Sequence, residues 1–209
     1  RCCASPSPTA PPRRRAELEP RAEPNLAGAA GGDEAPAPAS LPPAPLAAQV
    51  DVAVVGAGAA GLMAAHEAAR RGRRTLLLEK NQRCGLKILI SGGGRCNLTT
   101  TRQGADLEAQ YGARRGRFLR HALRSFPPTA LRAFVEGAGV PLVEEDLDKL
   151  FPVSQKARDV VDALLRLVGT AGVELWTEAP LRSLRRVEAG FELATGRGRV
   201  RATSVVLAT

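Results

Sequence analysis

The chain has 209 residues, which is room for one sizeable domain and a tail. Its formal net charge is +9, and because the first 49 residues carry as many acidic residues as arginines, the excess lies in residues 50–209. No apolar run approaches the ~20 residues that a membrane-spanning helix needs, so we expect a soluble protein.

Cysteine and histidine usage argues against a metal site or a disulfide scaffold. The cysteines are Cys2, Cys3, Cys84 and Cys96, with no C-x-x-C pair, and the histidines are at positions 66 and 121. This spacing offers no recognisable zinc site, and so few cysteines fit a reducing compartment. We therefore predict no bound metal.

Residues 1–48 are expected to form a disordered leader. They are rich in Ala, Pro, Ser and Gly, so they cannot bury enough apolar surface to offset the entropy of ordering. The segment resembles the surroundings of a plastid transit-peptide cleavage point, which predicts a chloroplast protein, with a cytoplasmic protein as the alternative. Its acidic residues are more numerous than in most transit peptides, which leaves a plain low-complexity leader open.

Residues 50–80, VDVAVVGAGAAGLMAAHEAARRGRRTLLLEK, show the pattern of a strand, a glycine-rich turn, a helix and a second strand. The alternating valines at the start suit a strand that is buried on both faces of a parallel sheet. A helical pattern then runs to Arg71, Gly72 closes it, and residues 73–78 form an apolar strand that ends on Glu79. The pattern predicts a βαβ unit.

The glycines of this turn fit the binding of a dinucleotide. Gly56 permits the tight turn, Gly58 lets the backbone approach a pyrophosphate, and Gly61 lets the helix pack close to the sheet. The helix N-terminus offers N–H groups to the phosphates, and Glu79 is placed to accept hydrogen bonds from a ribose. A βαβ unit whose glycines serve only packing is the alternative, and the motif alone does not separate FAD from NAD.

A second glycine-rich loop, SGGGRCN at residues 91–97, follows a linker over residues 80–89. Three successive glycines are costly in backbone entropy, which indicates that the chain passes very close to another group. Successive N–H groups in such a loop can form a concave anion site. We therefore expect a functional loop rather than a flexible hairpin tip.

The rest of the chain predicts helices followed by strands. Helical patterns cover residues 117–125, 129–136 and 155–170, with a short strand at 140–143 and a turn at 151–154 in which Ser154 is a candidate N-cap. From Val173 the apolar period changes to two, which predicts an antiparallel meander that returns to a buried strand beside the first one. The predicted fold class is α/β: a Rossmann-like domain over residues 49–209, in three layers, with a parallel sheet and an antiparallel β-meander.

Five segments together resemble one family of flavoproteins: GAGAAGLMAA, LLLEKN, GLKILISGGGRCNLT, FPVSQKARDVVDAL and VVLAT. The family is that of the aminoacetone oxidase-like, NAD(P)/FAD-dependent oxidoreductases. The resemblance covers about residues 50–209, and KILISGGGRCN is its most specific part. In this family the last strand continues as A-T-G-G with roughly as much chain again. The resemblance therefore implies an FAD-binding domain that is incomplete at its C-terminus and that holds FAD poorly by itself.

The resemblance also implies how FAD is bound. Its pyrophosphate would lie on the first glycine loop, its ribose on Glu79 and its adenosine half near Lys80, while the second loop would face the pyrophosphate and isoalloxazine. Leu181 would contact the adenine, and residues 208 and 209 would begin a second flavin contact. The implied cofactor-binding residues are Gly56, Ala57, Gly58, Ala59, Ala60, Gly61, Glu79, Lys80, Ser91, Gly92, Gly93, Gly94, Arg95, Cys96, Asn97, Leu181, Ala208 and Thr209.

The activity implied by the resemblance is hydride transfer to or from a small substrate that the sequence does not identify, with NAD(P)H as a candidate electron donor. Flavin disulfide reductases place a second cysteine about one helical turn after the first, whereas residues 97–101 contain none. We therefore expect Cys96 to pack rather than to act in redox catalysis, and His66 to be a surface residue. No catalytic residue can be named.

A flavoprotein that acts on RNA, of the tRNA-modifying type, is the alternative function, and a non-catalytic fragment is a third. An arginine run could form a nucleic-acid surface: Arg114, Arg115, Arg117, Arg120 and Arg124. Because only Tyr111 and Phe118 near this run could stack on bases, we expect a solvated helical face and no nucleic-acid partner.

Overall fold

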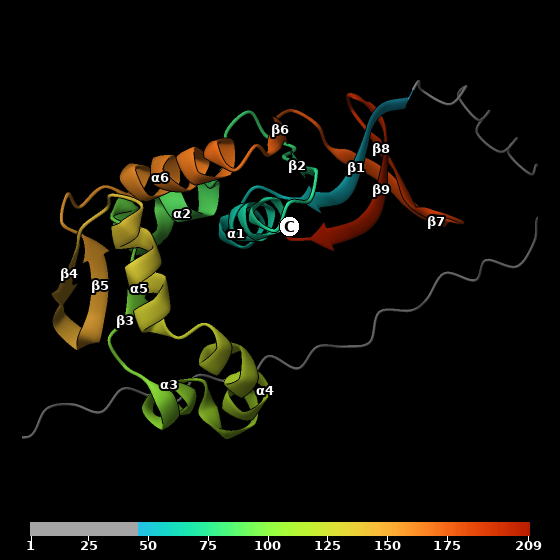
Figure 1. The fold of residues 1–209 in the computed structure, drawn as a ribbon. Helices are drawn as coiled ribbons and strands as arrows, with labels where there is room; N and C mark the ends of the chain where they lie inside the picture. Colours follow the sequence, from blue (N-terminus) through green and yellow to red (C-terminus); the bar gives the residue numbers. More distant parts are fainter. Residues whose placement is uncertain (1–45) are drawn as a thin grey trace, which may run out of the picture. The chain divides into compact units, whose positions relative to one another are not determined.

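A computed structural model describes residues 46–209, so almost all of the predicted leader lies outside the described residues (Figure 1). The elements are β1 (Leu46–Val55), α1 (Ala59–Arg70), β2 (Thr75–Leu78), α2 (Leu86–Ile90), the 3-10 turn η1 (Ser91–Gly94), β3 (Thr99–Thr100), α3 (Gly104–Gln110), α4 (Gly112–Ser125), α5 (Pro128–Gly137), β4 (Leu142–Glu145), the 3-10 turn η2 (Asp146–Asp148), β5 (Lys149–Pro152), α6 (Ala157–Thr170), β6 (Glu174–Trp176), β7 (Leu181–Val187), β8 (Gly190–Thr195) and β9 (Gly198–Leu207).

The main sheet has six strands in the order β6-β2-β1-β9-β8-β7. Its first four strands are parallel, and β7, β8 and β9 form an antiparallel meander. Strand β9 belongs to both parts, because its first half pairs with β8 while the strand also pairs with β1 up to Val55↔Leu207. The predicted return of the chain beside the first strand is therefore confirmed, as is the Rossmann-like α/β class, but the end of β9 is not buried as expected, because Val206 and Leu207 are exposed.

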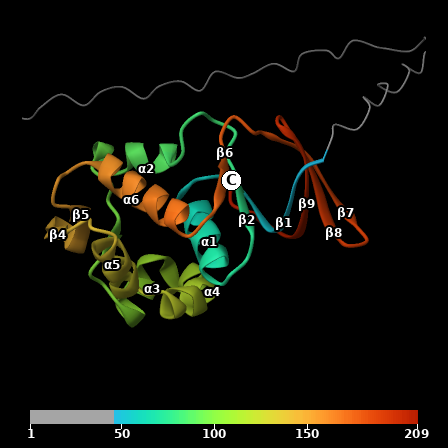
Figure 2. The same ribbon diagram turned by 45° about the horizontal axis from the view of Figure 1, so that its top comes forward.

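The buried side chains of this sheet divide by strand alternation between two apolar clusters. Val54 and Leu77 belong to the cluster that includes Leu62 of α1 and Val161 of α6. The neighbouring residues of β1 and β2 point the other way and pack with the meander, where Leu193 is fully buried. Figures 1 and 2 show α1, α2 and α6 grouped beside the parallel strands. The carboxyl ends of β1, β2 and β9 thereby share one edge of the sheet.

A second sheet, in the order β3-β5-β4, was not predicted. The segment 151–154, expected as a turn, contains the end of β5, whose Phe151 pairs with Val143. Ser154 does not cap a helix, because α6 begins later and has Lys156 at its N-cap. Strand β4 lies two residues beyond the predicted strand.

Several other predictions of local structure need correction. Strand β1 begins four residues before Val50, and part of the expected linker at 80–89 belongs to α2. Strand β6, which was expected to belong to the meander, instead pairs in parallel with β2. Period-two patterns identify strands but not the direction in which they pair.

In the part of the chain that the structure describes, no helix is long and apolar enough to span a membrane. Residues 46–209 also contain no group of three His, Cys, Asp or Glu side chains that could hold a metal ion.

Candidate functional site

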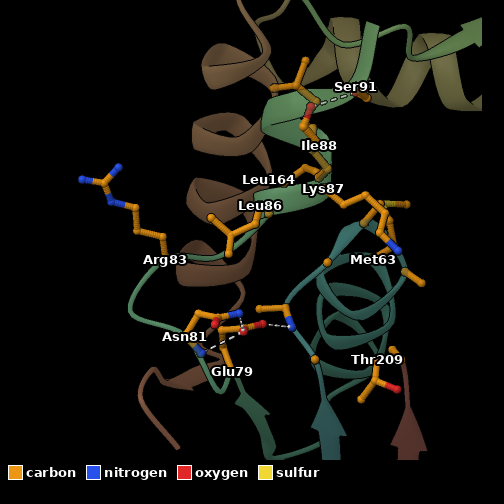
Figure 3. Close-up of a pocket in the computed structure, with 18 of the residues that line it drawn as sticks. Met63, Glu79, Asn81, Arg83, Leu86, Lys87, Ile88, Ser91, Leu164 and Thr209 are labelled. Carbon is orange, nitrogen blue, oxygen red and sulfur yellow. Dashed lines mark hydrogen bonds between the residues drawn. The ribbon is translucent and has the colours of Figure 1, made fainter. Parts of the chain in front are cut away.

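A cavity of about 800 Å³ opens at the shared carboxyl edge of β1, β2 and β9 (Figure 3). This is the place where open α/β sheets bind their ligands. Its walls come from the β1–α1 turn, the end of β2, helix α2, the second glycine loop, the faces of α5 and α6, the segment before β7 and the end of β9.

The three glycines of the β1–α1 turn differ in what an added side chain would meet. Gly56 has a φ of +102°, and a Cβ there would lie 2.6 Å from the carbonyl oxygen of Ala208. A Cβ at Gly61 would collide with the carbonyl oxygen of Gly56. Gly58 has a φ of −80° and no atom within 4 Å of an added Cβ, although it is the N-cap of α1 and lines the cavity. The fold therefore does not need a glycine at this position.

Glu79 stabilises the same turn from the end of β2. Its Oε2 accepts a hydrogen bond of 2.8 Å from the backbone N–H of Ala57, and its Oε1 accepts bonds from the backbone and side chain of Asn81. Figure 3 shows Glu79 and Asn81 together at one end of the cavity. Glu79 is 7% exposed, and these hydrogen bonds fix its carboxylate beside the turn before any ligand binds.

The second glycine loop reaches the cavity only with its ends. Ser91, Cys96 and Asn97 line the cavity, whereas Gly92, Gly93, Gly94 and Arg95 do not. All three glycines have positive φ, and a Cβ at Gly92 would come within 2.7 Å of the backbone nitrogen of Asn97. The close approach that the sequence predicted is therefore made within the loop itself.

Arg95 is a structural residue of this loop. Its Nη1 donates to both carboxylate oxygens of Glu145 and to the side-chain oxygen of Gln155, and its guanidinium lies 4.2 Å from the centre of the Phe151 ring. The hydrogen bond from Arg95, followed by that from Gln155, lowers the pKa of Glu145. Arg95 thus fastens the loop to the second sheet, and a role in binding a cofactor directly is not supported.

Three cations line the cavity, and Glu79 is the one acidic residue among the described residues that do so. Lys80 was predicted, but Arg83 and Lys87 were not. In Figure 3 Lys87 extends from α2 toward the side where Met63 lies, whereas Arg83 extends away from the other labelled residues. Lys87 was missed because the five-residue helix that carries it is too short to show a helical period.

The other side of the cavity is apolar. Met63, Ile88, Leu131, Val135 and Leu164 line it, and they come from four helices that the sequence did not bring together. Only the tertiary packing shows that these residues face one cavity.

Neither buried thiol is prepared for reaction. Burial raises the pKa of Cys96, and burial together with the charge of Glu79 raises that of Cys84. Both cysteines are free. The expectation of a packing role for Cys96 thus agrees with its surroundings. His66 is partly exposed, and its ring meets that of Phe134 edge to face at 5.5 Å.

Of the residues predicted to bind the cofactor, thirteen line the cavity: Gly56, Ala57, Gly58, Ala59, Ala60, Glu79, Lys80, Ser91, Cys96, Asn97, Leu181, Ala208 and Thr209. The lining residues that were not predicted are Val55, Met63, Leu78, Asn81, Arg83, Gly85, Leu86, Lys87, Ile88, Leu98, Leu131, Val135, Val160, Leu164, Ala179 and Pro180.

Two curated relatives match the chain over most of its length. The ribosomal RNA dihydrouridine synthase of Escherichia coli K12 is 32% identical over 162 residues, which are 76% of this chain and 39% of that protein. The 3-dehydro-bile acid delta(4,6)-reductase of Clostridium scindens is 28% identical over 159 residues, which are 75% of this chain and 38% of that protein. The chain therefore spans less than two fifths of the length of these relatives.

Two solved structures share the fold. The 3-ketosteroid-delta4-(5alpha)-dehydrogenase of Rhodococcus jostii RHA1 has a TM-score of 0.53 at 18% identity, covering 79% of this chain and 46% of that one. Thermovibrio ammonificans THI4 has a TM-score of 0.52 at 18% identity, covering 77% of this chain and 57% of that one.

A family model matches residues 50–209, the same stretch that carries the β1–α1 turn, the second glycine loop and the return strand β9. The chain belongs to the family of the HI0933-like protein Rossmann domain.

Proposed function

We propose that residues 49–209 form the FAD-binding domain of a flavin-dependent oxidoreductase. The observation that carries this proposal is Gly58, where neither backbone conformation nor packing accounts for the absence of a side chain. A pyrophosphate on the N-terminus of α1 would occupy the space that a Cβ would fill, and the first N–H groups of a helix have no acceptors within it.

The other residues around the turn fit the rest of the cofactor. Glu79 would accept a hydrogen bond from the ribose, and Leu181 would contact the adenine. Lys80 and Lys87 place positive charge on the cavity wall, which favours a pyrophosphate. Ser91, Cys96 and Asn97 would then lie along the cofactor toward its isoalloxazine.

FAD supplies the hydride chemistry when bound, while the chain positions it and excludes water. The names of the two curated relatives both describe hydrogen added to a carbon–carbon double bond, so we infer a reductase. NAD(P)H is the proposed electron donor.

The test is the cofactor content of the purified full-length protein. We expect a yellow preparation that releases FAD on heating and whose flavin is bleached by NADH or NADPH under anaerobic conditions. A colourless protein that binds NADH stoichiometrically would overturn the assignment of FAD.

The substrate has two candidates of different classes, a small molecule and a base in RNA. The bile acid reductase supports the first and the ribosomal RNA enzyme supports the second. Reoxidation of the reduced protein by a small α,β-unsaturated ketone or by unmodified ribosomal RNA, followed in parallel, would separate them.

A further inference from the structure

Helices α3 and α4 form a hairpin that takes no part in the cavity. None of the residues that line the cavity comes from either helix. The two helices pack closely at Gly116, where a Cβ would collide with the carbonyl oxygen of Glu108. The hairpin is therefore closely packed, and it does not contribute to the cavity.

The arginine run of α4 divides into two groups, of which the first holds the hairpin together. Arg120 Nε donates to Glu108 Oε2 at 2.8 Å, and Arg124 Nε donates to Glu108 Oε1 at 3.2 Å. Glu108 is nearly buried, with a side chain that is 9% exposed. The ion pairs with Glu108 therefore explain why these two positions are arginines.

Arg114, Arg115 and Arg117 form the second group. All three are exposed, and within residues 46–209 none of them forms an ion pair. Among the described residues this group forms one side-chain hydrogen bond, from Arg117 Nε to the carbonyl oxygen of Ala113, and it stays within the helix. Their charge is thus directed to solvent.

Phe118 lies among these cations and is 86% exposed. Helical spacing places Arg114, Arg117, Phe118 and His121 on one face of α4. The last three lie three, four and seven positions after the first. Gly116, the buried residue of the helix, faces the other way toward α3. An exposed phenyl ring contributes nothing to the fold here, and its neighbours are positively charged.

We propose that this surface, the α4 face (Arg114, Arg117, Phe118 and His121), docks a single-stranded stretch of RNA. The guanidinium groups would contact phosphates, and the Phe118 ring would stack on an unpaired base, the two features of single-strand binding surfaces. This proposal deepens the RNA alternative given above. It rests on that alternative for the identity of the polyanion as RNA.

Charge complementarity favours a polyanion as the occupant, and the single apolar residue favours RNA over a membrane. A helix that lies on a membrane needs a whole apolar face, whereas the α4 face has one ring between cations. Sequence alone favoured a solvated helix because aromatic residues were scarce; the position of Phe118 shows that one of them is presented to solvent beside the arginines.

The test is binding of the full chain to a fluorescein-labelled oligouridylate at several salt concentrations. The double variant Arg114→Ser/Arg117→Ser should lower the slope of log Kd against log salt by about 1.4, since each phosphate contact on a single strand contributes about 0.7. Phe118→Ala should weaken binding about tenfold at every salt concentration, Phe118→Tyr should restore it, and Phe118→Leu should not.

Arg182→Ser/Arg186→Ser is the matched control, because it removes the same charge from exposed positions of β7. An equal fall in slope for this control, or no effect of the α4 variants, would overturn the proposal. The proposal would also be overturned if the α4 variants lost binding to phosphatidylserine vesicles but bound the oligouridylate as the wild type does. Flavin content should not change in any variant, so a chain that bound RNA through α4 but no flavin would refute the proposed cofactor and leave this inference standing.

Discussion

The carboxylate of Glu79 accepts a hydrogen bond from the backbone N–H of Ala57, a residue 22 positions earlier in the chain. The end of β2 therefore fixes the shape of the turn that follows β1. A carboxylate oxygen has two acceptor sites. Oε1 uses both on Asn81, whereas Oε2 keeps one beyond its bond to Ala57, so one ribose hydroxyl can be accepted without any rearrangement.

Glu79→Gln should weaken both the fold and the binding of FAD. The amide nitrogen cannot accept a hydrogen bond, so one of the N–H groups now bound to Glu79 would be left without its acceptor, at a cost of about 1–3 kcal/mol. Chemical denaturation and flavin titration would measure the two effects. Glu136→Gln, at an exposed position of α5, is the control and should change neither by a comparable amount.

Gly58→Val and Gly61→Ala should separate binding from folding. The first variant should keep a near-normal melting temperature and lose flavin, because only the space of the pyrophosphate is filled. Each lost contact at the helix N-terminus contributes roughly 0.3–1 kcal/mol. Flavin at wild-type occupancy in this variant would mean that the phosphates lie elsewhere.

Gly61→Ala should act on the fold instead. Its methyl group would meet the carbonyl oxygen of Gly56, and overpacking of this kind costs about 1–3 kcal/mol. We expect a lower denaturation midpoint even without cofactor. A variant as stable as the wild type would show that α1 can move away from β1 at little cost.

Glu145→Gln should destabilise the protein in a pH-dependent way. Arg95 lowers the pKa of Glu145 in the fold, so its stabilisation is complete above the ordinary carboxyl pKa of 4.5 and is lost as the pH falls toward the lower folded value. The stability gap between wild type and variant should be constant near neutral pH and close in acid. Glu188→Gln, in the exposed turn after β7, is the charge-matched control.

Cys84 and Cys96 should resist alkylation in the native protein. Each unit of rise in pKa lowers the thiolate fraction about tenfold, and burial raises the pKa of both thiols. Peptide mapping after brief iodoacetamide treatment should show both unlabelled until denaturant is added. Rapid native labelling of Cys96 would reopen a redox role for it.

The first βαβ unit could be predicted from sequence because its information is local. The strand, the turn glycines and the helix up to Arg70 follow one another in a fixed register, and the sheet pairs β1 with β2 as expected. The second sheet could not, since β3 has two residues and β5 four, and their partners are set by contacts far apart in the chain.

The site residues also differ in whether local sequence or a distant contact determines their position. Gly58 and Glu79 belong to a motif whose spacing has a physical meaning, and both line the cavity. Arg95 fits its motif equally well, but its partner Glu145 is 50 residues away, and that distant contact turns it from the cavity. Lys87 has no motif of its own and is found only once α2 is seen to form a wall.

Strand β9 sets a fixed distance between the meander and the cavity. Its last pair with β8 is Phe191↔Ala202, and its last pair with β1 is Val55↔Leu207. One residue inserted between these two pairs would turn every later side chain to the opposite face and push Ala208 out of its place under Gly56. Residues 203–207 should therefore not tolerate any change in length, because the cavity edge and the meander are held in register through them.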